Sequence, residues 1–403
     1  MFLPLERKCL LLVAVAVLSA EQFAAADNWV GRRILPKSDS ALLMVGGQAV
    51  GDATGIHWPA AVTKANGSWL WVEDDGSTSF PRVAGWLRYD QVVPMNLALD
   101  YFNGRLLEGA DDGGLYWLRG ICWESQSEFE LARSDYQSAV TKAPYHRHAH
   151  SALARVLSKT GSPAADFLSQ FNVAKRVNPG HPRLYWDWGQ ALEKTDPATA
   201  KAHYTTASNL NPHWWQPYYS LGVLAGDQGE YDTSLAHLSQ AILRNPFDYR
   251  VLRDRAKFQL AALQKKNRTP SPADLTPVLA SASKACDLCY YRNCDSLEVM
   301  ASAFAAMKNY NVALHFQQMA VEQAQLSDKP KHTRKWQEYN TLLAGGGSRT
   351  PSSGPASPPG NEVATTRDAG SSLGIPGTNA PEQLPAPAGE QPAFVDRSGF
   401  SLP

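Results

Sequence analysis

A helix–turn–helix pattern between Tyr218 and Pro246 constrains the fold of this chain more than any other feature. Large or apolar residues recur three or four positions apart at Tyr218, Leu221 and Ala225, which is the spacing of one helix face. Gly229 interrupts this run, and a second helical run ends at Pro246, because proline cannot continue a helix. One helix pair cannot bury its own apolar face, so the pattern predicts a stack of at least ~3 units of ~34 residues each.

Similar runs occur on both sides of this unit. We assign repeats to residues 113–146, 147–181, 182–214, 215–248, a degenerate 249–293 and 294–327, with a capping helix over 332–343. The pattern resembles the tetratricopeptide repeat, whose consensus positions match Tyr218, Leu221, Gly222, Ala225, Tyr231, Ser234, Leu238 and Ala241, with Pro246 closing the unit. Serine at position 234 stands where alanine is usual. The resemblance implies a mainly α fold: an α-solenoid over 113–343 in which the first helix of each repeat lines a concave groove.

The stretch before the repeats, residues 27–93, has a different pattern. Short runs of β-forming residues alternate with turn signals such as Asn66-Gly67, which predicts about five short strands. The segments WLWV at 69–72 and GWLRYDQVVP at 85–94 resemble the bacterial SH3-like domain, which implies a small β-barrel. The acidic, tyrosine-rich signature of eukaryotic SH3 domains is missing, so their binding of proline-rich peptides does not carry over.

An amphipathic helix is expected between the β domain and the repeats. It covers 95–107 within a linking segment 94–112, and we expect it to cap the open face of the first repeat, as terminal helices do in solenoids.

The N-terminus has the composition of a secretion signal. A charged start precedes an apolar run from Cys9 to Leu18, and small residues at 24–26 predict cleavage before Asp27, so residues 1–26 form the expected signal peptide. We therefore expect an exported protein, periplasmic or extracellular, with tethering to the membrane by an uncleaved signal as the alternative. No later segment of the sequence is apolar enough to span a membrane.

The composition and motifs exclude several classes of function. The 38 Lys and Arg residues balance 38 Asp and Glu residues, so the net charge gives no argument for binding nucleic acid. The sequence contains no Gly-Lys-Ser/Thr phosphate loop, no Gly-x-Ser-x-Gly elbow and no His-Glu-x-x-His motif. We therefore predict a non-catalytic protein without a cofactor. Residues 344–403 are rich in Pro, Gly and Ser and are expected to be a disordered tail.

Potential metal ligands gather in two places, at His146, His148 and His150 and at Cys286, Cys289 and Cys294. The histidines straddle the start of a repeat helix, where polar residues are common. The cysteines lack the fourth ligand or second paired motif that zinc sites usually have. We predict no metal site from either group, and a disulfide within the cysteine cluster is an alternative in an oxidising compartment.

The expected concave groove carries the candidate binding residues. By template position its aromatic and basic side chains are Trp117, Arg155, Lys159, Arg183, Trp186, Tyr219, Arg253 and Lys257. Glu124, Glu193 and Asp227 lie at the rim and dilute the positive charge. This arrangement predicts a protein or peptide partner that is acidic or bears aromatic residues, because basic residues attract carboxylates and aromatic residues often anchor interfaces. An ordinary solvated helix face is the alternative interpretation.

The resemblance to bacterial proteins that join an SH3-like domain to tetratricopeptide repeats implies a non-catalytic, extracytoplasmic scaffold. In this function the concave groove binds a partner protein or peptide. The alternative is targeting to the cell envelope, in which the SH3-like domain holds peptidoglycan or another wall glycan.

Overall fold

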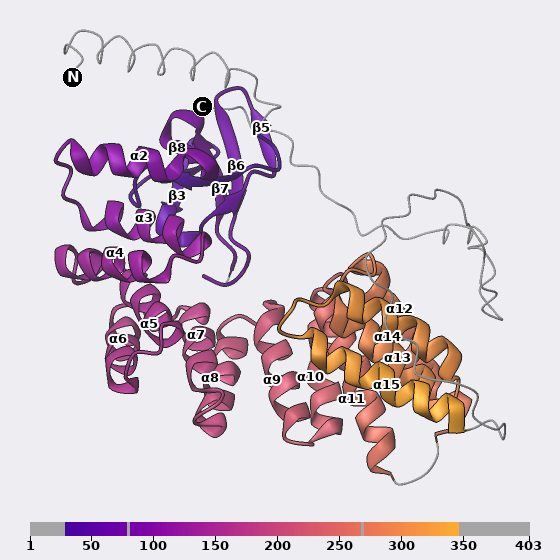
Figure 1. The fold of residues 1–403 in the computed structure, drawn as a ribbon. Coiled ribbons are helices and arrows are strands. Elements are labelled where there is room, and N and C mark those ends of the chain that lie inside the picture. Colours follow the sequence, from indigo (N-terminus) through magenta and orange to yellow (C-terminus); the bar gives the residue numbers. More distant parts are fainter. Residues whose placement is uncertain (1–28, 79–80, 267–269, 346–403) are drawn as a thin grey trace, which may run out of the picture.

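The computed structural model describes residues 29–78, 81–266 and 270–345, whose path is drawn in Figure 1. The expected signal segment 1–26 and nearly all of the expected tail 344–403 lie outside the described residues. Within the described residues the chain is mainly helical, with a β region at one end followed by a long series of stacked helices (Figure 1).

The β region consists of short strands in two small sheets. One sheet has the order β4-β1-β8, and the other has the order β3-β2-β7-β6-β5. The strands are β1 (Arg33–Pro36), β2 (Leu42–Val45), β3 (Gln48–Asp52), β4 (Ala60–Ala61), β5 (Lys64–Asn66), β6 (Trp69–Glu73), β7 (Ala84–Arg88) and β8 (Val92–Pro94).

Alternation of side chains sets the register of the five-stranded sheet. β6 buries Leu70 and Val72 on one face, while Trp71 points to the other face opposite Trp86 of β7. The two indole rings meet edge to face with their centroids 5.2 Å apart, a favourable cross-strand pair. Gly67 has a φ of +54° in the turn between β5 and β6, which explains why glycine follows Asn66 there.

The predicted closed β-barrel is wrong. Within the described residues β1 pairs only with β4 and β8, and the strands of the second sheet pair only among themselves. Helix α2 (Met95–Leu107) packs on β1 and β8 and buries Ala98 and Phe102 in the same apolar cluster as Ile34 and Leu35. Apolar surface that a barrel would bury inside itself is therefore buried against helices instead.

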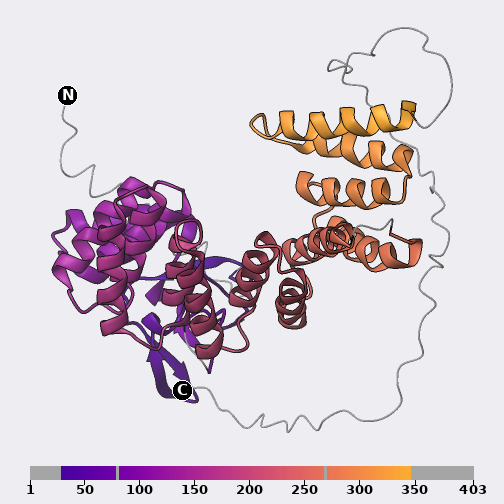
Figure 2. The same cartoon turned by 90° about the horizontal axis from the view of Figure 1, so that it is seen from below.

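In the part of the chain that the structure describes, the helices after α2 form six pairs and a final helix, α15 (Lys329–Gly345), which packs on α14. The pairs are α3 (Gly113–Ser125) with α4 (Phe129–Lys142), α5 (Ala149–Lys159) with α6 (Ala164–Val177), α7 (Pro182–Leu192) with α8 (Pro197–Leu210), α9 (Trp215–Asp227) with α10 (Tyr231–Arg244), α11 (Tyr249–Lys265) with α12 (Pro272–Leu288), and α13 (Cys294–Ala306) with α14 (Tyr310–Gln323). Figure 2 shows the last helices, in orange and yellow, stacked side by side. This succession is a helical-repeat solenoid.

The closest approach within the α9–α10 pair explains two residues of the repeat pattern. A Cβ on Gly222 would lie 2.7 Å from the Leu238 side chain, so only glycine allows this distance. Ser234, which replaces the usual alanine, is fully buried, and its hydroxyl donates to the carbonyl oxygen of Gly222 at 2.7 Å. The substitution is tolerated because the added polar group is hydrogen-bonded.

One buried apolar cluster runs from Trp29 through the β region and on to Leu224 in α9. The β region, the first three helix pairs and α9 therefore share a core, whereas α10 contributes to a second cluster with Leu238 and Ala241, and α11 to α14 contribute to a third around Leu275 and Leu297. Among the described residues, none of the helices is both long enough and apolar enough to cross a bilayer.

Candidate functional site: the inner face of the solenoid

The first helices of the pairs form one side of the solenoid, which we call the inner face: α3, α5, α7, α9, α11 and α13. Contacts join α5 to α7, α9 to α11 and α11 to α13, so first helices of neighbouring pairs lie side by side. All the predicted binding residues lie on these helices: Trp117 on α3, Arg155 and Lys159 on α5, Arg183 and Trp186 on α7, Tyr219 on α9, and Arg253 and Lys257 on α11.

Two loops of the β region occupy the inner face over α3, α5 and α7. The carbonyl oxygen of Thr54 lies 2.7 Å from Nε2 of His148, and the carbonyl oxygen of Ser77 accepts the backbone N–H of Arg183 at 2.9 Å. The carbonyl oxygen of Gly76 accepts from the Asn211 side chain. Only about 40 Å³ of open space remains between these loops and the helices. This half of the inner face is therefore filled by the chain's own β region.

Trp117 lies beneath this contact and is only 5% exposed. The ring of His146 packs 4.8 Å from its indole, and the ring of His148 stacks on it at 5.8 Å. His146 Nε2 lies 3.2 Å from an oxygen of Asp39, a residue of the β region. The sequence predicted Trp117 as an exposed groove residue, but it is buried against the rings of His146 and His148.

Buried ion pairs neutralise the basic residues of this half. Arg155 donates to both oxygens of Glu124, at 2.8 and 2.7 Å, and to Oδ2 of Asp187 at 2.8 Å. Arg183 lies 3.6 Å from the same Asp187 oxygen, and Lys159 donates to Glu124 at 3.2 Å. Burial opposes ionisation of Glu124, but the charge and hydrogen bonds of Arg155 and Lys159 hold the pKa of Glu124 well below its usual value. The positive charge expected here is balanced locally.

From Trp186 onward, the inner-face side chains have hydrogen-bond partners within the repeats themselves. Trp186 is half-buried and donates from Nε1 to the Ser220 hydroxyl at 3.0 Å. Tyr219 is also half-buried and donates to Oδ2 of Asp254 at 2.7 Å, while Arg253 donates to Oδ1 of Asp254 at 2.8 Å. Burial and the charge of Asp254 raise the pKa of Tyr219, so its phenol stays protonated as a donor.

A cavity of about 420 Å³ follows on the inner face between α11, α13 and α15. Its charged lining consists of four cations, Arg253, Lys257, Lys331 and Lys335, and three carboxylates, Asp254, Asp295 and Glu298. Leu260, Ala261 and Val299 add apolar side chains to the lining. Lys257 is 51% exposed and lies 3.3 Å from Asp227. An exposed pair of this kind holds its side chains weakly, so Lys257 can turn toward a ligand.

Of the histidines and cysteines that the sequence offered as potential metal ligands, each of the three histidines contacts a different group of the protein. His146 accepts backbone N–H groups at Nδ1, His148 contacts Thr54, and His150 lies 2.8 Å from Gln170 and 2.9 Å from the carbonyl oxygen of Pro144. These histidines are buried structural residues of the first two repeats. The described cysteines are all free thiols, so the alternative of a disulfide among Cys286, Cys289 and Cys294 is not formed.

Sequence reasoning included Glu124 and Asp227 but missed the acidic partners Asp187 and Asp254 and the β-region loops. Asp187 lies one turn after Arg183, and Asp254 follows Arg253 directly, so local charge spacing was an available signal for both. Contacts of Asn211 and His148 with residues more than 90 positions earlier carried no such signal.

No family model and no curated protein matches the sequence, whereas solved structures do match the fold. The APC/C hetero-tetramer Cut9-Hcn1 has a TM-score of 0.51 and 12% identity, covering 61% of this chain and 46% of that chain. Pseudomonas aeruginosa PilF has a TM-score of 0.46 and 16% identity, covering 61% and 98%, respectively. PilW, a type IV pilus biogenesis factor, has a TM-score of 0.44 and 15% identity, covering 51% and 90%. At 12% identity the likeness to Cut9-Hcn1 concerns architecture alone, and it agrees with the helical-repeat fold.

Proposed function

We propose that this protein is a non-catalytic interaction scaffold whose inner face, from α7 to α15, binds an extended acidic segment of a partner protein. The observation that carries the proposal is the cavity between α11, α13 and α15, which is lined by four cations, three carboxylates and apolar side chains and so has an excess of one positive charge. A carboxylate of the partner would compete with Asp227 for the half-exposed Lys257. Two hydrogen bonds to Asp254 fix the orientation of the Arg253 guanidinium, so Arg253 would offer the partner a donor group of fixed geometry.

The half-buried aromatic residues Trp186 and Tyr219 extend this surface toward the β region. Both have their polar atoms hydrogen-bonded within the protein, so they offer apolar ring area to a ligand. Aromatic side chains held in this way often supply much of the affinity of an interface. We infer that an aromatic residue of the partner packs here, and that the repeats are of the tetratricopeptide type.

In this proposal the inner face of the first three repeats binds the β region of the same chain instead of a partner protein. Trp117, Arg155 and Arg183 stabilise the docked β region and its ion-pair network. Partner binding then involves the remaining members of the predicted set, Trp186, Tyr219, Arg253 and Lys257, with Lys159 at the boundary. The alternative, in which the β region holds a wall glycan, stays a prediction, and we favour the inner face because the cavity between α11, α13 and α15 lies there.

Peptide display on the full chain, followed by fluorescence anisotropy, tests the proposal. We expect enriched peptides to be acidic with an aromatic residue, and we expect binding to weaken with salt because exposed charges are screened. Lys257→Glu combined with Lys335→Gln should reduce affinity at least tenfold. Arg334→Glu is the matched control, because Arg334 lies on α15 but lines a different hollow. Equal affinity of the double variant and the control would refute binding at this cavity.

We also propose that the protein is exported, on the basis of its N-terminal sequence alone. Intact mass of the protein from the envelope or medium fraction should place the mature terminus near Asp27. A retained Met1 in that fraction would contradict cleavage and favour a tethered form.

A further inference from the structure

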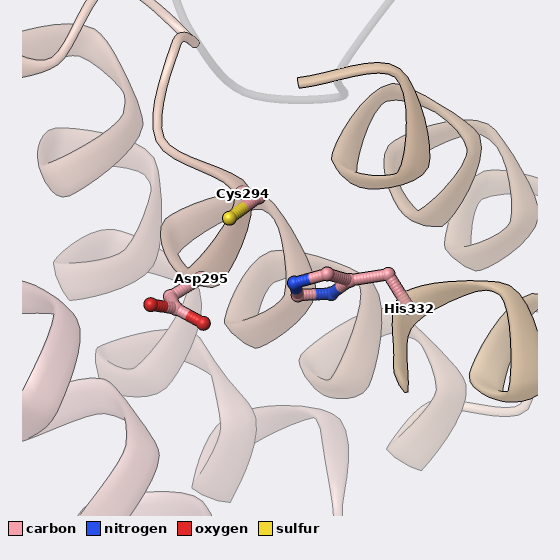
Figure 3. A group of neighbouring side chains, drawn as sticks. All are labelled: Cys294, Asp295 and His332. Atoms are coloured by element: carbon pink, nitrogen blue, oxygen red, sulfur yellow. The ribbon is translucent and has the colours of Figure 1, made fainter. Parts of the chain in front are cut away.

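Cys294, Asp295 and His332 come together at the junction of α13 and α15, although 37 positions separate His332 from Asp295. Their potential ligand atoms all lie within 4.8 Å of one another. In Figure 3 the ring of His332 extends from its helix toward Cys294 and Asp295 at the start of α13. A thiol, an imidazole and a carboxylate are the ligand types that zinc takes in proteins.

His332 is placed as a metal ligand would be. The residue is completely buried, and among the described residues neither of its ring nitrogens, Nδ1 or Nε2, makes a hydrogen bond of good geometry. Its Nδ1 lies 2.7 Å from Oε2 of Glu298, which is one turn after Cys294 on α13. A carboxylate at one ring nitrogen orients the imidazole and leaves the other nitrogen free to bind a metal. A buried imidazole nitrogen without a partner is otherwise costly, because it has lost water and gained nothing.

The carboxylates at this place already attract cations. Lys331 lies 3.3 Å from Asp295 and 3.5 Å from Glu298, Lys335 lies 3.0 Å from Glu298, and Arg253 lies 3.9 Å from Asp295. The Lys331 side chain is 60% exposed, so it can move into solvent when a divalent ion arrives. Lys335 and Arg253 can stay on the outer oxygens.

We propose that Cys294, Asp295 and His332 bind one zinc ion, with Glu298 as a positioning residue for the imidazole. Ligand atoms of tetrahedral zinc are about 3.5 Å apart, so the partly exposed Cys294 and Asp295 side chains must close by about 1 Å around the ion. Water takes the fourth position, since three protein ligands leave it open. Zinc here would bind α15 to α13 and so stabilise the end of the solenoid.

The test uses the full chain, freed of metal with a chelator and then titrated with Zn²⁺ or Co²⁺. We expect one ion per chain by calorimetry, a chelator-reversible rise in the thermal midpoint, and a thiolate-to-cobalt charge-transfer band. Cys294→Ser should remove that band, whereas Cys289→Ser, which changes another partly exposed thiol nearby, should keep it. Glu298→Gln should keep the band and weaken zinc binding about 10–100-fold.

Cys294→Ser is the decisive variant. Because Cys294 is partly exposed, its replacement by serine should leave the core intact, and circular dichroism can verify this. His332→Gln serves as a second variant and should also weaken binding. A wild-type chain without the band would overturn the proposal, and so would a band that survives Cys294→Ser. A band lost only in Cys289→Ser would place the ion at the Cys286–Cys289 pair and would equally refute this site.

Discussion

Replacement of Arg155 by methionine tests how strongly the buried ion pairs stabilise the solenoid. Methionine keeps most of the apolar stem but removes three charge-assisted hydrogen bonds to Glu124 and Asp187. Asp187 is 1% exposed and Glu124 is 15% exposed at the side chain, so both carboxylates would stay buried without their main partner.

Breaking a buried pair by removing one partner costs about 3–5 kcal/mol. We expect the lower end, about 3 kcal/mol, because some partners remain. Glu124 keeps Lys159 at 3.2 Å and the Tyr136 hydroxyl at 3.0 Å, and Asp187 keeps Arg183 at 3.6 Å. Equilibrium unfolding in urea, followed by circular dichroism, measures the loss. Arg133→Met is the control, because Arg133 forms an exposed pair with Glu130 whose removal should cost less than about 1 kcal/mol.

The dependence on pH separates lost charge pairing from lost packing. In the wild type the pKa of Glu124 is depressed below its usual 4.5, so this stabilisation is complete above about pH 4.5 and declines as pH falls further. In the variant, burial without Arg155 raises the pKa of Glu124, so its carboxyl can take up a proton in the folded state. The deficit of the variant should therefore be largest near about pH 7 and shrink toward about pH 4. A deficit below about 1 kcal/mol, or one that does not change with pH, would refute the reasoning.

Two further predictions concern packing and pH. Ala241 is fully buried where α10 meets its neighbours, so Ala241→Leu should destabilise the protein by about 1–3 kcal/mol in urea unfolding, while the same change at the exposed Ala236 of the same helix should have little effect. Burial beside His146 lowers the pKa of His148 to about 3 from 6.5, so stability that is complete above about pH 6.5 should be lost as pH falls toward 3. His148→Gln should flatten that pH dependence of the thermal midpoint; an unchanged profile would exclude His148 as its source.

The repeat architecture could be predicted because its causes are local in sequence. Apolar residues at helical spacing and a glycine where two helices touch, such as Gly222 against Leu238, recur within each unit. The β region could not be predicted correctly, because the strand signals are equally consistent with two open sheets, one of which packs against helix α2. Short strands show where a sheet forms but not whether its edges meet.

The groove residues were placed on the right helices from the repeat pattern, but their surroundings depend on tertiary contacts. Lys257 is half-exposed, while Trp117, at an equivalent kind of position, is buried under the rings of His146 and His148. Repeat spacing assigns a side chain to the inner face and says nothing about what covers that face.

The sequence by itself determined the helical repeats, since each helix pair follows from residues within about 34 positions of one another. Tertiary structure alone decided that the β region fills the first half of the inner face, through pairs such as Thr54 with His148 and Gly76 with Asn211. Tertiary structure also brings His332 of α15 close to Cys294 of α13, in the last part of the solenoid. These contacts join elements whose sequence patterns are independent, so they are set by how two separately formed surfaces fit together and not by any periodicity along the chain.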